Sequence, residues 1–197
     1  MAKSESDSSQ REHKKNAQWV ITVFLTTIVV SGLISLLSEE VMSRSGMFAA
    51  FLILLIIVIV GILFDIIGVA VTSADEKPFH SMASRRVPGA REAIRLLRNA
   101  ERVSSICNDV VGDICGVVSG AASATIAARI LNYMTFSWPQ LIMLAMSALV
   151  AGLTVGGKAV GKAVAIHNCT EIVYQVGKLL NAKNRCLAWI LKKKEQR

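Results

Sequence analysis

Long uninterrupted apolar runs dominate the hydrophobic pattern of this chain. Four of them are long enough to cross a membrane, given about 1.5 Å of helix rise per residue and a hydrocarbon core of about 30 Å. They cover residues 17–37, 46–73, 104–131 and 138–165. None alternates apolar and polar residues with the period of two that a membrane β-barrel requires. The pattern predicts an all-α polytopic membrane protein with four transmembrane helices.

Two segments outside these runs have an amphipathic helical pattern. Residues 89–103 place Ile94 and Leu97 on one side and several arginines on the other, and residues 171–191 have a similar character. We expect both segments to be interfacial helices, because a basic amphipathic helix can lie at an anionic membrane surface. A solvated connector is the alternative for the first segment.

Composition supports the membrane class and excludes several others. Of the 197 residues, 53% are hydrophobic and only 18% are charged, whereas a soluble domain carries about a quarter charged residues. The four cysteines form no CxxC pair, and the three histidines lack the spacing of zinc ligands. The net charge is +8, but the basic residues are not interleaved with aromatic residues, so we do not expect nucleic acid as a partner.

The basic residues instead predict how the chain is oriented in the membrane. Four Lys or Arg residues lie in the first 17 residues, seven in 74–103 and nine in 158–197, while Arg44 and Arg129 lie on or near the short loops between these regions. Cytoplasmic loops carry an excess of Lys and Arg. We therefore expect an integral protein of the plasma (inner) membrane with both termini in the cytoplasm.

Acidic residues inside the apolar runs are the candidate functional groups. Asp65 lies toward the cytoplasmic end of the second run, and Asn108 and Asp109 lie at the same end of the third. Asp109 and Asp113 share a helix face because they are four residues apart. An ionisable group costs about 2.5–3.5 kcal/mol at the centre of a span, and hard cations prefer carboxylate and amide oxygens. These residues predict a metal site of Asp65, Asn108 and Asp113, supported by Asp109.

Two other interpretations of these acids remain open. In the first, Lys158 or Arg102 neutralises them as a structural ion pair. In the second, Asp65 and Asp113 imitate the dyad of an intramembrane aspartyl protease, although no accompanying motif is present. The sequence contains no P-loop, GxSxG, HExxH or CxxC motif, so we do not expect an enzyme.

Small residues recur at every fourth position of the third run. They are Gly112, Gly116, Gly120, Ala124 and Ala128. Such a stripe lets a second helix approach closely, either within the chain or across a dimer interface. A second cluster surrounds the repeat GKAVGKAV (157–164), and glycine-rich helices can also break and expose carbonyl oxygens that bind ions.

Three stretches resemble the transmembrane domain of the CNNM/CorC magnesium transporter family. LFDIIGVAVTSA (63–74) is similar to the family's F-F-S-G-S-E-T-A-L-T-S segment. AIRLLRNAERVSSICND (93–109) is similar to A-L-R-L-L-E-N-P-D-R-F-L-S-T-x-x-x-x-N, and GKAVGKAVAIHN (157–168) to G-E-x-x-P-K-x-x-A-x-x-N. The resemblance covers about residues 47–180, and its elements agree in order and spacing.

The resemblance implies a magnesium site at Asp65 and Asn108 and sodium-coupled efflux by a homodimer. Gly112 stands where the family has a second asparagine, so Asp113 would supply the missing oxygen. Backbone carbonyls freed by irregular helix near Gly68 and Gly112 would complete the ligand shell.

The chain also departs from the family pattern. Asp65 replaces a serine, and Gly68 and Lys158 each replace a glutamate. The bound ion is therefore expected to be Mg²⁺ or another hard cation, with Na⁺ as a candidate coupling ion.

These observations predict the organisation of the chain. We expect a disordered cytoplasmic tail (1–16), an extra transmembrane helix with a short loop (17–45), a CNNM/CorC-like transmembrane domain (46–180) and a basic tail (181–197) without the family's cytosolic regulatory domain. The leading hypothesis is transport of a divalent cation across the lipid bilayer. The alternative is a non-transporting interaction or regulatory subunit that docks an unknown partner through the small-residue stripe.

Overall fold

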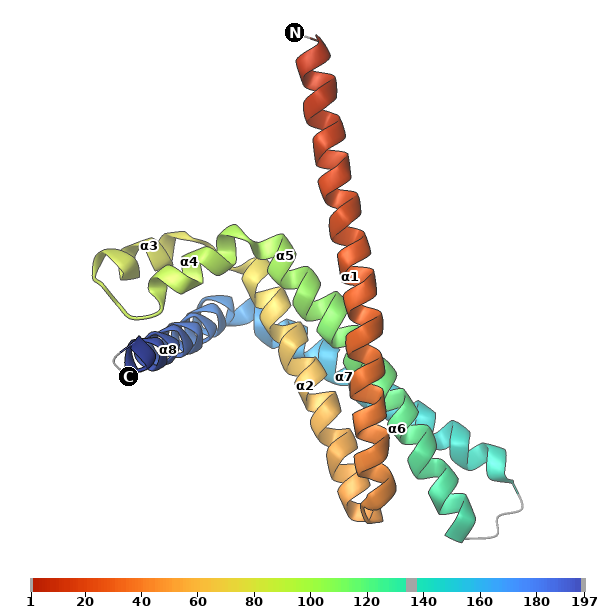
Figure 1. Cartoon of the computed structure of the whole chain (residues 1–197). Coiled ribbons are helices and arrows are strands. Elements are labelled where there is room, and N and C mark those ends of the chain that lie inside the picture. The colour runs from red at the N-terminus through yellow and green to blue at the C-terminus, as the bar shows by residue number, and fades with distance from the viewer. Residues whose placement is uncertain (1, 134–137, 196–197) are drawn as a thin grey trace.

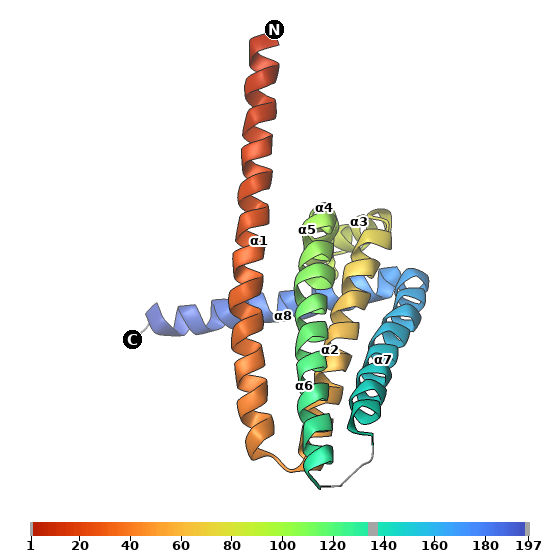
Figure 2. The same cartoon turned by 90° about the vertical axis from the view of Figure 1, so that its right-hand side faces the viewer.

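The structure, a computed structural model, describes the backbone of residues 2–133 and 138–195 and the side chains of 20–41, 44–132 and 138–183. Four long helical segments run alternately up and down (Figures 1 and 2). They are α1 (Ala2–Arg44), α2 (Met47–Ser73), the continuous run from α5 (Ala100–Ser104) through α6 (Gly112–Tyr133), and α7 (Pro139–His167).

Each of these segments is long and apolar enough to cross a membrane. The candidate spans are Val20–Val41, Met47–Ser73, Ala100–Asn132 and Pro139–His167, with mean hydropathies between 1.6 and 3.3. Large apolar side chains such as Phe24, Phe48 and Leu144 are exposed on their outer faces, where lipid would cover them. The protein is therefore an all-α polytopic membrane protein, and the four predicted spans are confirmed.

The first helix is longer than its apolar run. Residues 2–16, expected to be a disordered tail, continue α1 toward the N-terminus as one helix. The physical reason is that seven of these fifteen residues are Lys, Glu, Gln or Arg, which have good helix propensity, and that the stretch adds to a helix that is already nucleated. In Figures 1 and 2 this part of α1 projects beyond the other helices.

The helices α2, α6 and α7 form the core of the bundle. Their buried apolar side chains form one cluster: Ala50, Leu54, Val58, Ala122, Ile126 and Val150. Glycines let α7 approach α2, because a β-carbon on Gly161 would lie 2.8 Å from Ile66 Cγ1 and one on Gly157 would overlap Ile62. This packing holds the acid-bearing part of α2 between two other helices.

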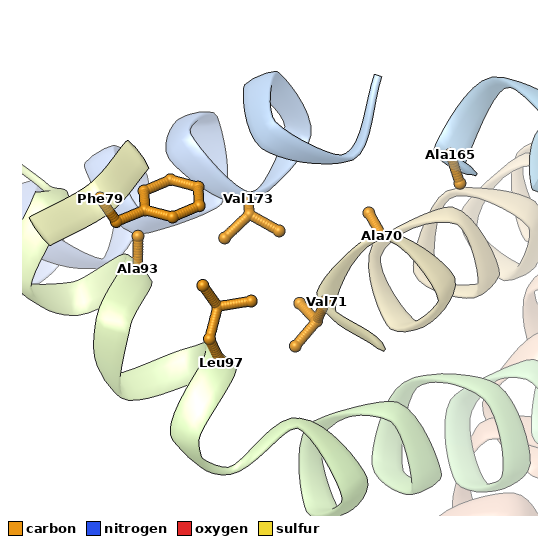
Figure 3. Close-up of a cluster of buried hydrophobic side chains, with 7 residues drawn as sticks. All are labelled: Ala70, Val71, Phe79, Ala93, Leu97, Ala165 and Val173. Carbon is orange, nitrogen blue, oxygen red and sulfur yellow. The ribbon is translucent and has the colours of Figure 1, made fainter. Parts of the chain in front are cut away.

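A second core lies at the end of the bundle where α2 and α7 meet the three remaining helices. These are α3 (Lys77–Ser84), α4 (Ala90–Arg98) and α8 (Cys169–Glu195), and in Figure 2 α8 runs across the long helices. Figure 3 shows its side chains: Ala70, Val71, Phe79, Ala93, Leu97, Ala165 and Val173. This cluster fixes the end of α2 that carries Asp65.

The two amphipathic segments pack on each other through this second core. Residues 89–103 form α4 and α5, with an interruption at Asn99, and α4 buries Ala93 and Leu97 against the protein. Its arginines remain exposed. The close approach of α4 to α8 requires Gly89, which has φ 91° and whose added β-carbon would lie 2.7 Å from the backbone nitrogen of Lys178. The other predicted segment, 171–191, lies within α8.

Candidate cation site

The third membrane span contains a π-helix at the depth of the predicted site. This segment, η1 (Ser105–Val111), joins α5 to α6, and the N–H of Gly112 donates to the carbonyl of Cys107, five residues earlier. A π-helix widens one turn and alters the direction of the side chains on either side of it. Short π-helical segments inside α-helices are frequent at functional sites.

Asn108 projects from this π-helix onto the backbone of α2. A β-carbon on Gly68 would lie 2.7 Å from Asn108 Cγ, so only glycine leaves room for the amide. Asn108 Nδ2 donates to Ser104 Oγ at 3.1 Å, which leaves Oδ1 on the Gly68 side. Among the described residues this buried Oδ1 has no hydrogen-bond partner.

Asp65 lies on the same side of α2 as Gly68, because residues three apart are neighbours on a helix. Its side chain is only 4% exposed. Its Oδ2 is likewise buried and has no hydrogen-bond partner in the described part of the chain. The structure therefore has two buried, unsatisfied acceptor oxygens on the facing sides of α2 and η1.

The packing of α2 on the third span defines the depth of Asp65. A β-carbon on Gly61 would lie 2.9 Å from Cys115 Cβ, while Gly68 faces Asn108. Because α2 and the third span are antiparallel, a residue between Gly61 and Gly68 on α2 lies level with a residue between Cys115 and Asn108 on the third span. Asp65 therefore lies level with the junction of η1 and α6, near Gly112. This is the depth at which the sequence predicts a cation site.

Asp109 and Asp113 lie on a different face of the third span. Both are exposed, and both line a groove of about 360 Å³ opposite Val20 and Thr27 of α1. They share one face, as their spacing predicts, but that face points toward α1 while Asn108 faces α2. The four predicted ligands are therefore divided between two places, and among the described residues no three His, Cys, Asp or Glu side chains form a metal-binding group.

Neither Lys158 nor Arg102, the two basic residues considered as partners of these acids, pairs with Asp65 in the described part of the structure. Lys158 of α7 is half-buried, and its Nζ lies 3.3 Å from the position of a β-carbon on Gly112. Lys158 therefore reaches into the bundle at the depth of Asp65. Arg102 is exposed on α5.

One detail of the site was missed in the sequence, and one prediction was wrong. The role of Ser104 as the partner of the Asn108 amide was missed, although the spacing of four residues between them was a usable signal. The expected helix break at Gly68 does not occur, because α2 continues as regular helix from Met47 to Ser73. Gly68 is needed for the close approach of Asn108 instead. Irregular backbone is found just before Gly112, in η1.

The small-residue stripe is only partly used inside the chain. Gly112 is buried, whereas β-carbons on Gly116 or Gly120 would meet nothing within 4 Å, and Ala124 is exposed. The side of α6 that packs inward carries Ile114, Val118, Ala122 and Ile126. Most of the stripe therefore faces outward, beside a groove between α6 and α7 that Ser119, Ser123 and Thr154 also line.

Comparison of the chain with known protein families, with curated proteins and with solved structures finds no match.

Proposed function

We propose that this protein binds a divalent cation between its second and third membrane spans and moves it across the bilayer. The observation that carries the proposal is the pair of buried, unsatisfied oxygens, Asp65 Oδ2 and Asn108 Oδ1. An ionised carboxylate buried without a partner costs several kcal/mol, so residues in this state are expected to have a binding partner. A cation held between α2 and η1 would satisfy both oxygens at once.

The chemistry of the two oxygens favours Mg²⁺ as the cargo. Mg²⁺ usually keeps several of its waters and is bound through one or two carboxylates, whereas Ca²⁺ takes six to eight oxygen ligands. One carboxylate and one amide oxygen match the first description. The π-helix beside them supports the proposal because short π-helical segments inside α-helices are frequent at functional sites.

The resemblance to the CNNM/CorC family supports transport and not only binding. It implies efflux of Mg²⁺ coupled to Na⁺ by a homodimer in the plasma (inner) membrane. Both termini would lie in the cytoplasm, because the basic segments 74–103 and 158–197 would then face the cytoplasm. On this proposal Asp65 and Asn108 are the primary ligands, and Asp109 with Asp113 form a separate acidic face toward α1.

Cation-dependent thermal stabilisation of the full chain in detergent tests the site. A ligand that binds only the folded state adds about 2.7 kcal/mol of stability at 100 times its Kd. We expect Mg²⁺ to stabilise the wild type, and Asp65→Asn and Asn108→Ala to lose that effect. The Asp109→Asn/Asp113→Asn double variant is the matched control, since it removes two membrane-span carboxylates from a different face and is expected to keep the Mg²⁺ effect.

The same variants separate binding from transport when they are reconstituted into liposomes that contain a magnesium-sensitive dye. Wild type and the double variant should show Mg²⁺ flux, and Asp65→Asn should not. Without Mg²⁺, Asp65→Asn should still fold, because asparagine keeps the size of the side chain and removes a buried charge. Equal Mg²⁺ stabilisation of wild type and Asp65→Asn would contradict the site.

A second candidate function rests on the outward-facing stripe of Gly116, Gly120 and Ala124. Small residues on an exposed membrane helix permit close packing of another helix. In this alternative the protein is an interaction or regulatory subunit that docks a partner there without transporting an ion. A folded wild type that no cation stabilises, and that shows no flux, would favour it.

A further inference from the structure

The position of Lys158 suggests how the proposed cation site is regulated. Its neighbour Gly157 contacts Ile62 of α2, and Gly161 contacts Ile66, so Lys158 lies at the depth of α2 that includes Asp65. Lys158 belongs to α7, which lies on the opposite side of the bundle from α1 (Figure 2). A formal positive charge is thus held inside the bundle, level with a buried carboxylate.

The ammonium group of Lys158 points into the bundle at the end of the π-helix. Both Lys158 Nζ and the carbonyl oxygen of Cys107 lie close to the position of a β-carbon on Gly112, at 3.3 Å and 3.5 Å. The absence of a side chain at Gly112 therefore leaves the space that the ammonium group uses. Lys158 is half-buried, whereas Lys162, one turn later on α7, is exposed.

The ammonium group does not form a salt bridge with Asp65, although the two lie at one depth. Within the described residues Lys158 takes part in no hydrogen bond or salt bridge, and Asp65 Oδ2 has no partner. A lysine side chain is long and flexible, with a compact point charge at its end. It is therefore free to move toward the carboxylate or away from it.

We propose that Lys158 is a tethered competitor for the cation site: its ammonium group, held beside Gly112, can extend toward Asp65, and a divalent cation bound at Asp65 excludes it. This inference rests on the proposed function. Two positive charges near one carboxylate repel each other strongly in a medium of low dielectric constant, so the cation and the ammonium group exclude each other. Lys158 then weakens cation binding and lowers the charge cost of the empty site.

Substitution of Lys158 tests this role. Half-saturating Mg²⁺ concentrations are measured from thermal stabilisation at constant ionic strength for the full-length wild type, Lys158→Gln, Lys158→Arg and Lys162→Gln. Loss of the charge in Lys158→Gln should lower the half-saturating concentration at least about tenfold. Lys158→Arg keeps the charge and should stay near wild type, and Lys162→Gln is the matched control that should also be unchanged.

A second measurement uses the unaltered protein, so it does not depend on how the variants fold. Acetic anhydride labels free amines, and mass spectrometry of peptides reports the rate at each lysine. Saturating Mg²⁺ should increase the labelling rate of Lys158 at least about threefold and leave Lys162 unchanged, because the displaced ammonium group becomes more accessible. An unchanged or lower rate at Lys158 would overturn the proposal.

The outcomes separate this inference from the proposed function. If Asp65→Asn abolishes Mg²⁺ stabilisation while Lys158→Gln binds no more tightly than wild type, the cation site stands and the competitor role is overturned. If Asp65→Asn binds Mg²⁺ as wild type does, the site itself is wrong and the role of Lys158 falls with it. Mg²⁺ binding that is tighter in Lys158→Gln than in wild type and is lost in Asp65→Asn would support both.

Discussion

Asn108 occupies the space that a side chain on Gly68 would need. An added β-carbon at Gly68 would lie 2.7 Å from Asn108 Cγ and 3.0 Å from Nδ2. The amide is therefore held against the backbone of α2, one turn from Asp65. The close approach of Asn108 to α2 depends on the absence of a side chain at a single position.

We predict that Gly68→Ala lowers stability and disrupts the cation site together. The new methyl group has to displace Asn108, and overpacking of this kind costs about 1–3 kcal/mol. Thermal unfolding in detergent should show the loss, and stabilisation by Mg²⁺ should weaken. Gly116→Ala is the control, because its β-carbon meets nothing within 4 Å and alanine stabilises a helix by about 0.5–1 kcal/mol over glycine. Unchanged stability and Mg²⁺ binding in Gly68→Ala would contradict the packing described.

The contact between Gly157 and Ile62 predicts a pair of compensating substitutions. A β-carbon on Gly157 would overlap Ile62 Cδ1 and lie 3.3 Å from Cγ1. Gly157→Ala should destabilise the protein, and Ile62→Val, which removes Cδ1, should relieve most of that loss. A double-mutant cycle measured by thermal unfolding should give a coupling energy within the range of about 0.5–3 kcal/mol found for residues in contact. Strictly additive effects would mean that the two residues do not touch.

The core formed by α3, α4 and α8 should depend strongly on Phe79. This ring is fully buried, with an exposed fraction of 0%, among side chains from α2, α4 and α8 (Figure 3). Phe79→Ala should cost about 3–5 kcal/mol of unfolding free energy, because it leaves a cavity in a packed core. Phe48→Ala provides the comparison. Phe48 is 83% exposed on α2, so this variant should lose far less unfolding free energy in detergent.

The outward stripe on α6 predicts a dissociable homodimer. Gly120→Leu adds a side chain at a position where the β-carbon itself would meet nothing within 4 Å, so we expect the single chain to fold. If two copies pack through this stripe, the dimer dissociation constant should rise at least about tenfold. Light scattering during size-exclusion chromatography in detergent measures the change, with Val117→Leu on an exposed neighbouring position as the control. If Gly120→Leu dimerises as tightly as wild type, the dimer contact lies on another face. If the wild type is a monomer, the prediction of a dimer is wrong.

The spans could be predicted from the sequence because they depend only on length and hydrophobicity. Each predicted run lies on a helix that is long and apolar enough to cross a membrane. The extension of α1 through residues 2–16 was not predicted, because a polar composition is compatible both with disorder and with a helix that continues an apolar one. The short helix α3, which begins next to Pro78, was also not predicted.

The arrangement of the site could be predicted only in part. Asn108 and Asp109 are adjacent in sequence, and adjacent residues on a helix point about 100° apart. Their actual directions, one toward α2 and the other toward α1, also depend on the π-helix, which shifts the phase of the turns around it. No local sequence pattern specifies that shift. The inward direction of Lys158 likewise depends on the packing of α7 against α2 through Gly157 and Gly161.

The groove between α1 and α6 indicates a role for the first helix besides setting the topology of the chain. Asp109 and Asp113 lie within the span Ala100–Asn132, on a side that neither α2 nor α7 covers. Val20 and Thr27 of α1 stand opposite them. If α1 were removed, two carboxylates would face acyl chains directly, and each would have to become protonated or draw water into the bilayer. In a bilayer, the first helix would thus shield one side of a charged surface on the neighbouring helix from lipid.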